Sequence, residues 1–246
     1  MHIFLKLAKS ELVLLRREPM VAAFGLFFPT VLVIILGCIP SFREPTPDLG
    51  GLRVIDFYVP ITLALILAMI AFQTMPQILA TYREKGILRR LATTPARPVM
   101  LLGAQVTVML AVAIASAVLV LVVGRVAFDV ALPAHPLVYA VSFLLCAAAV
   151  LSIGVFVAAV APSGKAAGGI GMAVFFPSIF FAGVYTPREV MPDVLQRIGE
   201  VTPLGAGQAA LQAAGTGHWP SMLSVTVVAA YLAVFGFAAA RFFRWE

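Results

Sequence analysis

The chain has 246 residues, of which 62% are hydrophobic and 11% charged, and its formal net charge is +6. A soluble domain carries about a quarter charged residues, so this composition excludes an ordinary soluble protein and indicates a single integral membrane domain over residues 1–246. Positive charge favours a nucleic acid partner in soluble proteins. Here Lys and Arg lie in short loops between apolar stretches, where they orient membrane spans, so we expect the lipid bilayer and no nucleic acid as a partner.

Residues 1–18 predict an amphipathic helix that lies in the membrane surface. Its apolar side chains share one helical face: Phe4, Leu5, Ala8, Leu12 and Leu15. Arg16, Arg17 and Glu18 interrupt the apolar core that a signal peptide would need. We therefore expect an interfacial helix ahead of the first span.

Six apolar stretches are long enough to cross roughly 30 Å of hydrocarbon. They cover about residues 20–39, 57–81, 99–123, 137–161, 166–185 and 221–240. Pro60 and Pro76 predict kinks in the second span. Gly168, Gly169 and Gly171 begin the fifth span and let a neighbouring helix approach closely.

Two segments between the fifth and sixth spans, 187–199 and 203–215, are too short to cross a membrane. They predict a re-entrant or interfacial outer hairpin over residues 187–215. The expected fold is an all-α integral membrane protein with six transmembrane helices and an N-terminal interfacial helix. A further cytoplasmic helix is expected between spans two and three.

That further helix is predicted at 83–95, in the densest charge cluster of the chain. The cluster holds one acid, Glu84, and five basic residues: Arg83, Lys85, Arg89, Arg90 and Arg97. Ile87, Leu88 and Leu91 recur at helical spacing, and Pro95 ends the helix. Taken alone, the stretch also fits a solvated loop that only fixes topology.

Basic residues are distributed unevenly between the two sides of a six-span chain. Twelve of the 17 Lys and Arg residues fall on the side of the termini and the loops after spans two and four, and five fall on the other side. The positive-inside rule places both termini and the 83–95 helix in the cytoplasm. We expect a multi-pass protein of the cell (inner or cytoplasmic) membrane.

The spans lack the groups that intramembrane chemistry needs. None has an Asp, Glu, Lys or Arg near its centre, so coupling to protons or sodium ions is not indicated and the energy for transport comes from elsewhere. Ser163-Gly164-Lys165 resembles the end of a nucleotide-binding loop, but Ala159 and Ala166 stand where Gly and Ser or Thr are required. We expect no catalytic residue, no metal and no cofactor bound by this chain.

Two motifs resemble ABC transporter permeases of the type-two (drug and polysaccharide export) family, of the daunorubicin-resistance-like kind. The first matches the family's coupling helix at Glu84, Lys85, Gly86, Leu88, Arg90, Leu91, Thr94 and Pro95. The second is similar to the outer helices before the last span and includes Gly183, Pro187, Pro192 and Pro203. Together the motifs and the order of elements cover essentially the whole chain.

The resemblance implies the membrane subunit of an ATP-driven exporter of hydrophobic or amphipathic molecules, such as drugs, lipids or glycan precursors. It implies two ABC ATPase subunits that bind ATP and Mg²⁺, and a second permease subunit that is a copy or a related chain. The second and fifth spans would line the path, with Gln73, Thr74, Gln105, Phe176 and Phe180 as candidate contacts. Hydrogen bonding between helices and ordinary packing account equally well for these side chains.

Other functions fit parts of the sequence. A stand-alone channel or facilitator explains the uncharged spans but not the motif at 84–95. A structural membrane scaffold explains the spans alone, and an intramembrane enzyme lacks convergent catalytic residues.

Overall fold

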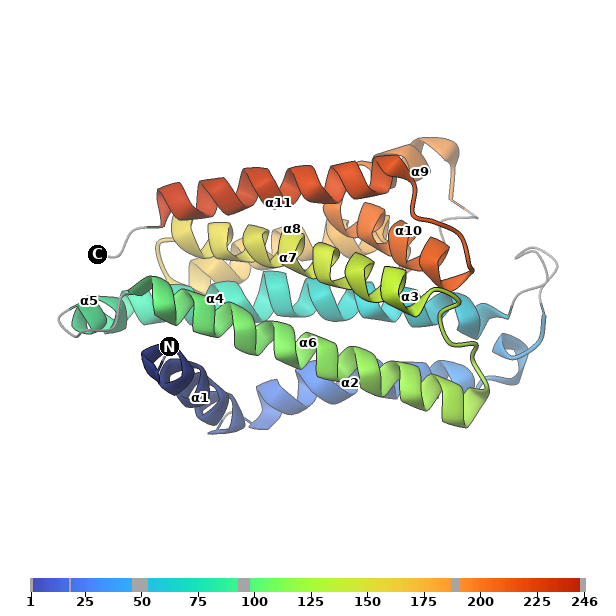
Figure 1. The fold of residues 1–246 in the computed structure, drawn as a ribbon, viewed down its shortest axis with the longest axis horizontal. Coiled ribbons are helices and arrows are strands. Elements are labelled where there is room, and N and C mark those ends of the chain that lie inside the picture. Colours follow the sequence, from blue (N-terminus) through green and yellow to red (C-terminus); the bar gives the residue numbers. More distant parts are fainter. Residues whose placement is uncertain (1, 18, 46–52, 93–97, 187–190, 244–246) are drawn as a thin grey trace.

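The computed structural model describes residues 2–17, 19–45, 53–92, 98–186 and 191–243. Within these ranges the regular structure is helical, apart from one isolated bridge between Pro45 and Arg53. The predicted all-α fold is confirmed (Figure 1). The elements in chain order are α1 (His2–Arg17), α2 (Pro19–Gly37), η1 (Pro40–Phe42), α3 (Val54–Ala68), η3 (Met69–Thr74), α4 (Met75–Glu84), α5 (Ile87–Ala92), α6 (Pro98–Phe128), α7 (Pro136–Val160), α8 (Gly164–Phe181), α9 (Asp193–Glu200), α10 (Pro203–Gly215) and α11 (Met222–Phe242).

Five helices in the described residues are long and apolar enough to cross a membrane. They are Val54–Glu84 (α3, η3 and α4 in one run), Val99–Phe128, Pro136–Val160, Gly164–Phe181 and Met222–Phe242. The predicted first span coincides with α2, of which Gly25–Gly37 qualifies as a shorter apolar helix. Six spans therefore remain a prediction.

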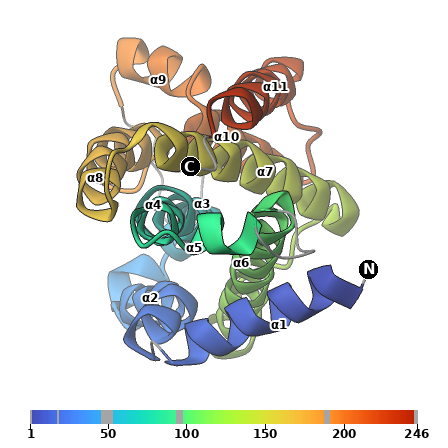
Figure 2. The ribbon, with the colours of Figure 1, turned by 90° about the vertical axis from the view of Figure 1, so that its left-hand side faces the viewer.

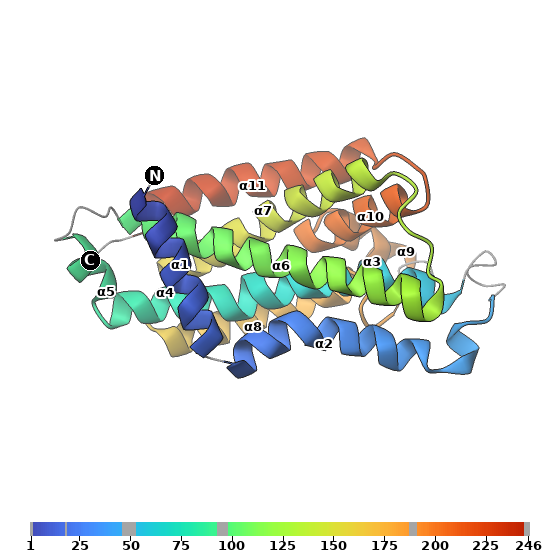
Figure 3. The same cartoon turned by 60° about the horizontal axis from the view of Figure 1, so that its bottom comes forward.

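The α3–η3–α4 span lies at the centre of the bundle. Viewed along the bundle, α3 and α4 are surrounded by α2, α6, α7 and α8 (Figure 2). Elements α1 and α5 lie at one end, called here the α5 end, and α9 and α10 lie toward the other, called the α10 end (Figure 1). Helix α1 runs across α6 instead of along it (Figure 3).

The central span changes its hydrogen-bond pattern at η3, a π-helical turn. There the Met75 N–H donates to the Ile70 carbonyl, five residues earlier in the chain. Pro76 follows at once and has no N–H, so an uninterrupted α-helix would leave the Phe72 carbonyl without its donor. The kink predicted at Pro76 therefore falls at a change of helix type, whereas Pro60 lies inside α3.

Two glycines of neighbouring helices pack against this turn. A Cβ atom on Gly154 of α7 would overlap the carbonyl oxygen of Ala71, and one on Gly171 of α8 would overlap that of Phe72. The predicted role of Gly171 in close helix approach is thereby confirmed, and its partner is the backbone of η3.

Three predicted boundaries are wrong. Helix α6 continues to Phe128, where an Arg125–Asp129 ion pair of 2.6 Å, one helical turn apart, supports its last turn. Helix α8 ends at Phe181, and Gly183 then turns the chain with a φ of 87°. The predicted 83–95 helix is broken at Lys85, as described below.

The segment predicted to form an outer hairpin contains two short helices, α9 and α10. Helix α10 has the predicted bounds: the Thr202 hydroxyl accepts from the Gly205 N–H at 3.3 Å and caps its start. It is buried against α7, because a Cβ on Gly207 would overlap the Cys146 sulfur. Helix α9 (Asp193–Glu200) covers the later part of the predicted 187–199 segment and ends one residue beyond it. Residues 187–190 lie outside the described residues.

Candidate functional site

The basic cluster forms the end of one helix and the start of another. Helix α4 ends at Glu84, and Gly86 then adopts a φ of 66°, a left-handed conformation that residues with a side chain rarely adopt. Helix α5 begins at Ile87 and is six residues long in the described part of the chain. The predicted single helix from 83 is therefore wrong, because Lys85 and Gly86 leave the helical conformation.

Glu84 contacts the turn between α7 and α8. Its Oε2 accepts a hydrogen bond from the backbone N–H of Gly164 at 3.0 Å. Gly164 begins α8, and the hydroxyl of Ser163 caps that helix by accepting from Ala166 N–H at 3.2 Å. A carboxylate at a helix N-terminus meets unsatisfied N–H groups and the positive end of the helix dipole, so this contact is favourable.

Arg83 holds the other side of the same turn. Its guanidinium donates to the Ala159 carbonyl at 2.8 Å and also to the Ala161 carbonyl, at the C-terminus of α7. A cation there complements the negative end of the helix dipole. Because a Cβ on Gly164 would overlap the Thr81 hydroxyl, the turn sits directly on α4. The end of α4 is thus bonded to both α7 and α8.

The other residues of the first motif divide between surface and core. Lys85 and Arg90 are exposed, as is Glu84 itself, whereas Leu88 is 1% exposed and anchors α5 on the bundle. The side chain of Leu91 and the residues Thr94 and Pro95 lie outside the described part. The exposed charges and the anchored leucine give α5 one face toward the protein and another toward its surroundings.

A cavity of about 420 Å³ opens beside this end of α4. Its lining comes from α1, α4, the Lys85 turn, the start of α5 and α6: Glu11, Leu14, Gln77, Ile78, Thr81, Tyr82, Lys85, Ile87, Gln105 and Met109. The Tyr82 hydroxyl donates to Glu11 Oε2 at 2.8 Å. Burial raises the pKa of Glu11, and the Tyr82 hydrogen bond offsets part of this shift.

The predicted path residues are only partly brought together. Gln73 and Thr74 are half-buried on η3, which packs against α8. On α8, Phe180 is half-buried and Phe176 is 52% exposed. Gln105 belongs elsewhere: it lies on α6 and lines the cavity at the α5 end with Glu11. The position of Gln105 in the sequence of its span did not indicate which neighbouring helix its side chain faces.

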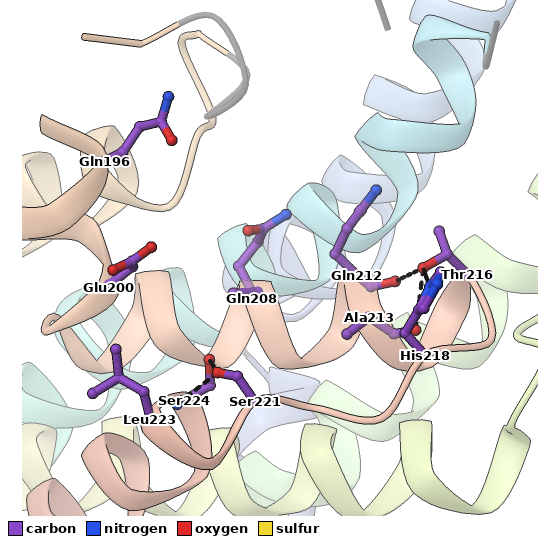
Figure 4. Close-up of a pocket in the computed structure, with 11 residues that line it drawn as sticks. Gln196, Glu200, Gln208, Gln212, Ala213, Thr216, His218, Ser221, Leu223 and Ser224 are labelled. Carbon is purple, nitrogen blue, oxygen red and sulfur yellow. Dashed lines mark hydrogen bonds between the residues drawn. The ribbon is translucent and has the colours of Figure 1, made fainter. Parts of the chain in front are cut away.

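A second cavity, of about 540 Å³, lies at the α10 end (Figure 4). Its polar lining comes from α9, α10 and the start of α11: Gln196, Glu200, Gln208, Gln212, Thr216, His218, Ser221 and Ser224. The Thr216 hydroxyl donates to the Gln212 carbonyl at 3.0 Å, and the Ser221 and Ser224 hydroxyls lie 2.9 Å apart. Amides and hydroxyls of this kind can hydrogen bond a neutral polar molecule.

The second motif places its residues around that end of the bundle. Gly183 takes a left-handed turn after α8, Pro192 precedes α9, and Pro203 begins α10 in a buried position. Pro187 lies outside the described residues. None of the three described residues lines the second cavity.

Sequence reasoning missed several contacts of the site. Glu11 and Tyr82 were not singled out, Gly164 was weighed only as part of an incomplete nucleotide-loop motif, and Arg83 was counted only as a member of the basic cluster. The Ser163-Gly164 pair after a long span is a helix-start signal that would have located the beginning of α8. Nothing in the sequence pairs Glu11 with Tyr82, because they lie 71 positions apart.

Long apolar helices around a central span, with charges gathered at one end, define a multi-pass helical membrane protein. The chain matches the model of the ABC-2 type transporter family over residues 3–214. It belongs to this family and is therefore a permease subunit of a transporter, not a catalytic domain. Permeases of this family work with an ATPase partner. No curated protein matches the chain.

Proposed function

We propose that this permease exports a hydrophobic or amphipathic molecule with energy from ATP hydrolysed on a separate ABC ATPase. Two ATPase subunits, each binding ATP and Mg²⁺, would sit beneath a pair of permeases, with α1, α5 and both termini on the cytoplasmic side. The daunorubicin-resistance-like motifs favour drug-like substrates, and lipids or glycan precursors share the same amphipathic chemistry.

The contact between Glu84 and Gly164 carries the proposal. A movement of α5 would reach α8 through the 3.0 Å hydrogen bond of Glu84 and reach α7 through the bonds of Arg83 to the Ala159 and Ala161 carbonyls. The same movement would reach the path directly, because α4 continues into η3 and its residues Gln73 and Thr74. Thus one docking surface would act on three spans.

A second permease would cover the apolar face of α8. Only 22% of the most apolar window of this span is buried, and Met172 and Phe176 are half exposed. Gln73 and Thr74 lie on the neighbouring η3. Pairing across this region would enclose the candidate path residues between two subunits.

Co-purification tests the proposal. The chain is expressed with the ABC ATPase encoded beside it, extracted in mild detergent, and assayed for complex formation and ATP hydrolysis. We expect a stable complex whose hydrolysis responds to the permease. Glu84→Ala should uncouple hydrolysis from the permease by roughly tenfold or more, while the permease still inserts and folds.

Asp193→Ala is the matched control, because Asp193 is an exposed carboxylate on α9, toward the α10 end, and lines neither cavity. It should leave complex formation and hydrolysis unchanged. If no ATPase binds under several gentle extraction conditions, the proposal fails and a stand-alone channel or a scaffold becomes the better account.

A further inference from the structure

The cavity beside Glu11 combines features of a ligand site that the proposed transport path does not use. At about 420 Å³ it is within the roughly 300–1,000 Å³ typical of sites for small ligands. Its lining residues come from α1, the end of α4, the Lys85 turn, the start of α5 and α6. At this end α1 crosses the bundle (Figure 3), and the apolar spans give way to the charged residues 83–90. At that depth a membrane offers lipid headgroups.

The polar lining of this cavity offers acceptors that can take further hydrogen bonds from a ligand. Gln105 is 1% exposed, and its Oε1 has no hydrogen-bond partner among the described residues. Glu11 is 5% exposed and accepts one hydrogen bond, from Tyr82, so its carboxylate retains further acceptor capacity. A buried acceptor without a donor is costly, and a ligand that supplies N–H groups removes that cost.

The same cavity is also lined by a positive charge, opposite to that of the Glu11 carboxylate, and by apolar side chains. Lys85 lines it and offers an ammonium group, while Gln77 and Thr81 add neutral hydrogen-bonding groups. Leu14, Ile78, Ile87 and Met109 complete the lining with apolar surface. A matching ligand therefore carries a cation with N–H donors, an anion and an acyl chain.

We propose that this cavity binds the headgroup of a zwitterionic phospholipid with a primary ammonium, of the phosphatidylethanolamine kind. The ammonium donates to Glu11 and Gln105, the phosphate meets Lys85, and the acyl chains leave along the apolar residues. A phosphatidylcholine headgroup has the same charges but no N–H, so it leaves Gln105 Oε1 unpaired. The lipid joins α1 to α4 and α6, and the site depends on insertion in a membrane, not on export.

Binding of short-chain lipids to the full-length permease tests this proposal. The protein is purified in mild detergent, stripped of lipid, and titrated with dioctanoyl-phosphatidylethanolamine and dioctanoyl-phosphatidylcholine, with native mass spectrometry as the readout. We expect the wild type to bind the ethanolamine lipid roughly tenfold or more tightly. Equal binding of the two lipids would overturn the assignment.

Variants assign the preference to the named groups. Glu11→Gln and Gln105→Leu should each abolish the tenfold preference, and Lys85→Met should weaken both lipids equally. Asp193→Asn, at an exposed carboxylate on α9 that lines neither cavity, is the matched control and should keep the wild-type preference. A preference that survives both Glu11→Gln and Gln105→Leu would place the lipid elsewhere, and Lys85→Met keeps the test usable if a buried substitution prevents folding.

Soluble phosphoethanolamine separates a lipid from a free headgroup. It presents the same ammonium and phosphate without acyl chains, so it should bind at least a hundredfold more weakly than the dioctanoyl lipid. Equal affinity would show a site for a small soluble zwitterion and overturn the lipid assignment. These measurements need no ATPase, so their failure leaves the proposed export function untouched, and loss of ATPase binding leaves the lipid result untouched.

Discussion

The Val54–Glu84 span and α8 are both apolar, but they hold opposite positions in the bundle. In the most apolar window of each, 78% of the residues of Val54–Glu84 are buried, against 22% in α8. The first packs on all sides, and the second packs on one face through Gly171 and exposes the other. Hydropathy alone makes them equivalent, and only packing separates a central span from a peripheral one.

The largest expected effect is a loss of stability when a phenylalanine is truncated in the central span, compared with the same substitution in α8. Phe72 in the central span is 0% exposed, so Phe72→Ala leaves a cavity and should cost about 3–5 kcal/mol of stability. Phe176 on α8 is 52% exposed, so Phe176→Ala should change stability by less than about 0.5 kcal/mol. Chemical denaturation in detergent measures both, and equal losses would refute the contrast between the spans.

A pair of glycines on α8 sharpens the comparison. A Cβ on Gly171 would overlap the Phe72 carbonyl oxygen, whereas one on Gly169 would meet nothing within 4 Å. Gly171→Ala should cost about 3 kcal/mol by overpacking, and Gly169→Ala should be neutral or stabilising by up to about 1 kcal/mol. Thermal unfolding of the two variants gives the answer, and a stable Gly171→Ala protein would contradict the close packing at η3.

A smaller effect is expected where the central span meets the start of α8. The new Cβ in Gly164→Ala would overlap the Thr81 hydroxyl and displace the backbone N–H from Glu84. We expect a loss of about 1–3 kcal/mol together with weaker ATPase coupling. Lys165→Ala, at the exposed neighbouring residue, is the control. Normal coupling in Gly164→Ala would separate α8 from the proposed transmission.

The smallest expected effect depends on pH. Burial raises the pKa of Glu11 above its ordinary value of 4.5. An acid with a raised pKa in the folded state costs stability above that pKa, and the cost vanishes as the pH falls to the unfolded value. In lipid-free detergent, Glu11→Gln should therefore melt a few degrees above wild type at neutral pH, and this difference should shrink toward pH 4.5. A difference independent of pH would show that Glu11 does not ionise there.

The existence and the bounds of a helix were predictable from the sequence where residues within that helix or next to it determine them. The apolar length of each stretch predicted the long helices, and the short segment predicted from Pro203 to Gly215 has the bounds of α10. Its start was predictable because a proline at the first helical position and the cap before it act locally. The family followed from the motif wording at 84–95 and 181–204. The match to the ABC-2 type transporter family over residues 3–214 confirms it.

The remaining features depend on contacts between distant segments. The residues on both sides of the break at Lys85–Gly86 share one charged pattern that is typical of a single helix. Gly86 is the one residue in the sequence that indicates the break. The place of Gln105 follows from which face of α6 meets α1 and α4, which the nearly uniform apolar sequence of that helix does not reveal. Position 11 could not be predicted as buried, because an acid on a surface helix is normally exposed.

The π-helical turn has a geometric consequence for the central span. An α-helix advances by about 100° per residue, so moving the extra residue of η3 one position along the chain would rotate the residue that it passes by about that angle and leave the helices on either side in place. Such a step exchanges one backbone hydrogen bond for another and shortens nothing. Gln73 and Thr74 lie within η3, so such a step would turn one of their side chains without moving the ends of the span. Gly154 and Gly171 carry no side chain that would block this change.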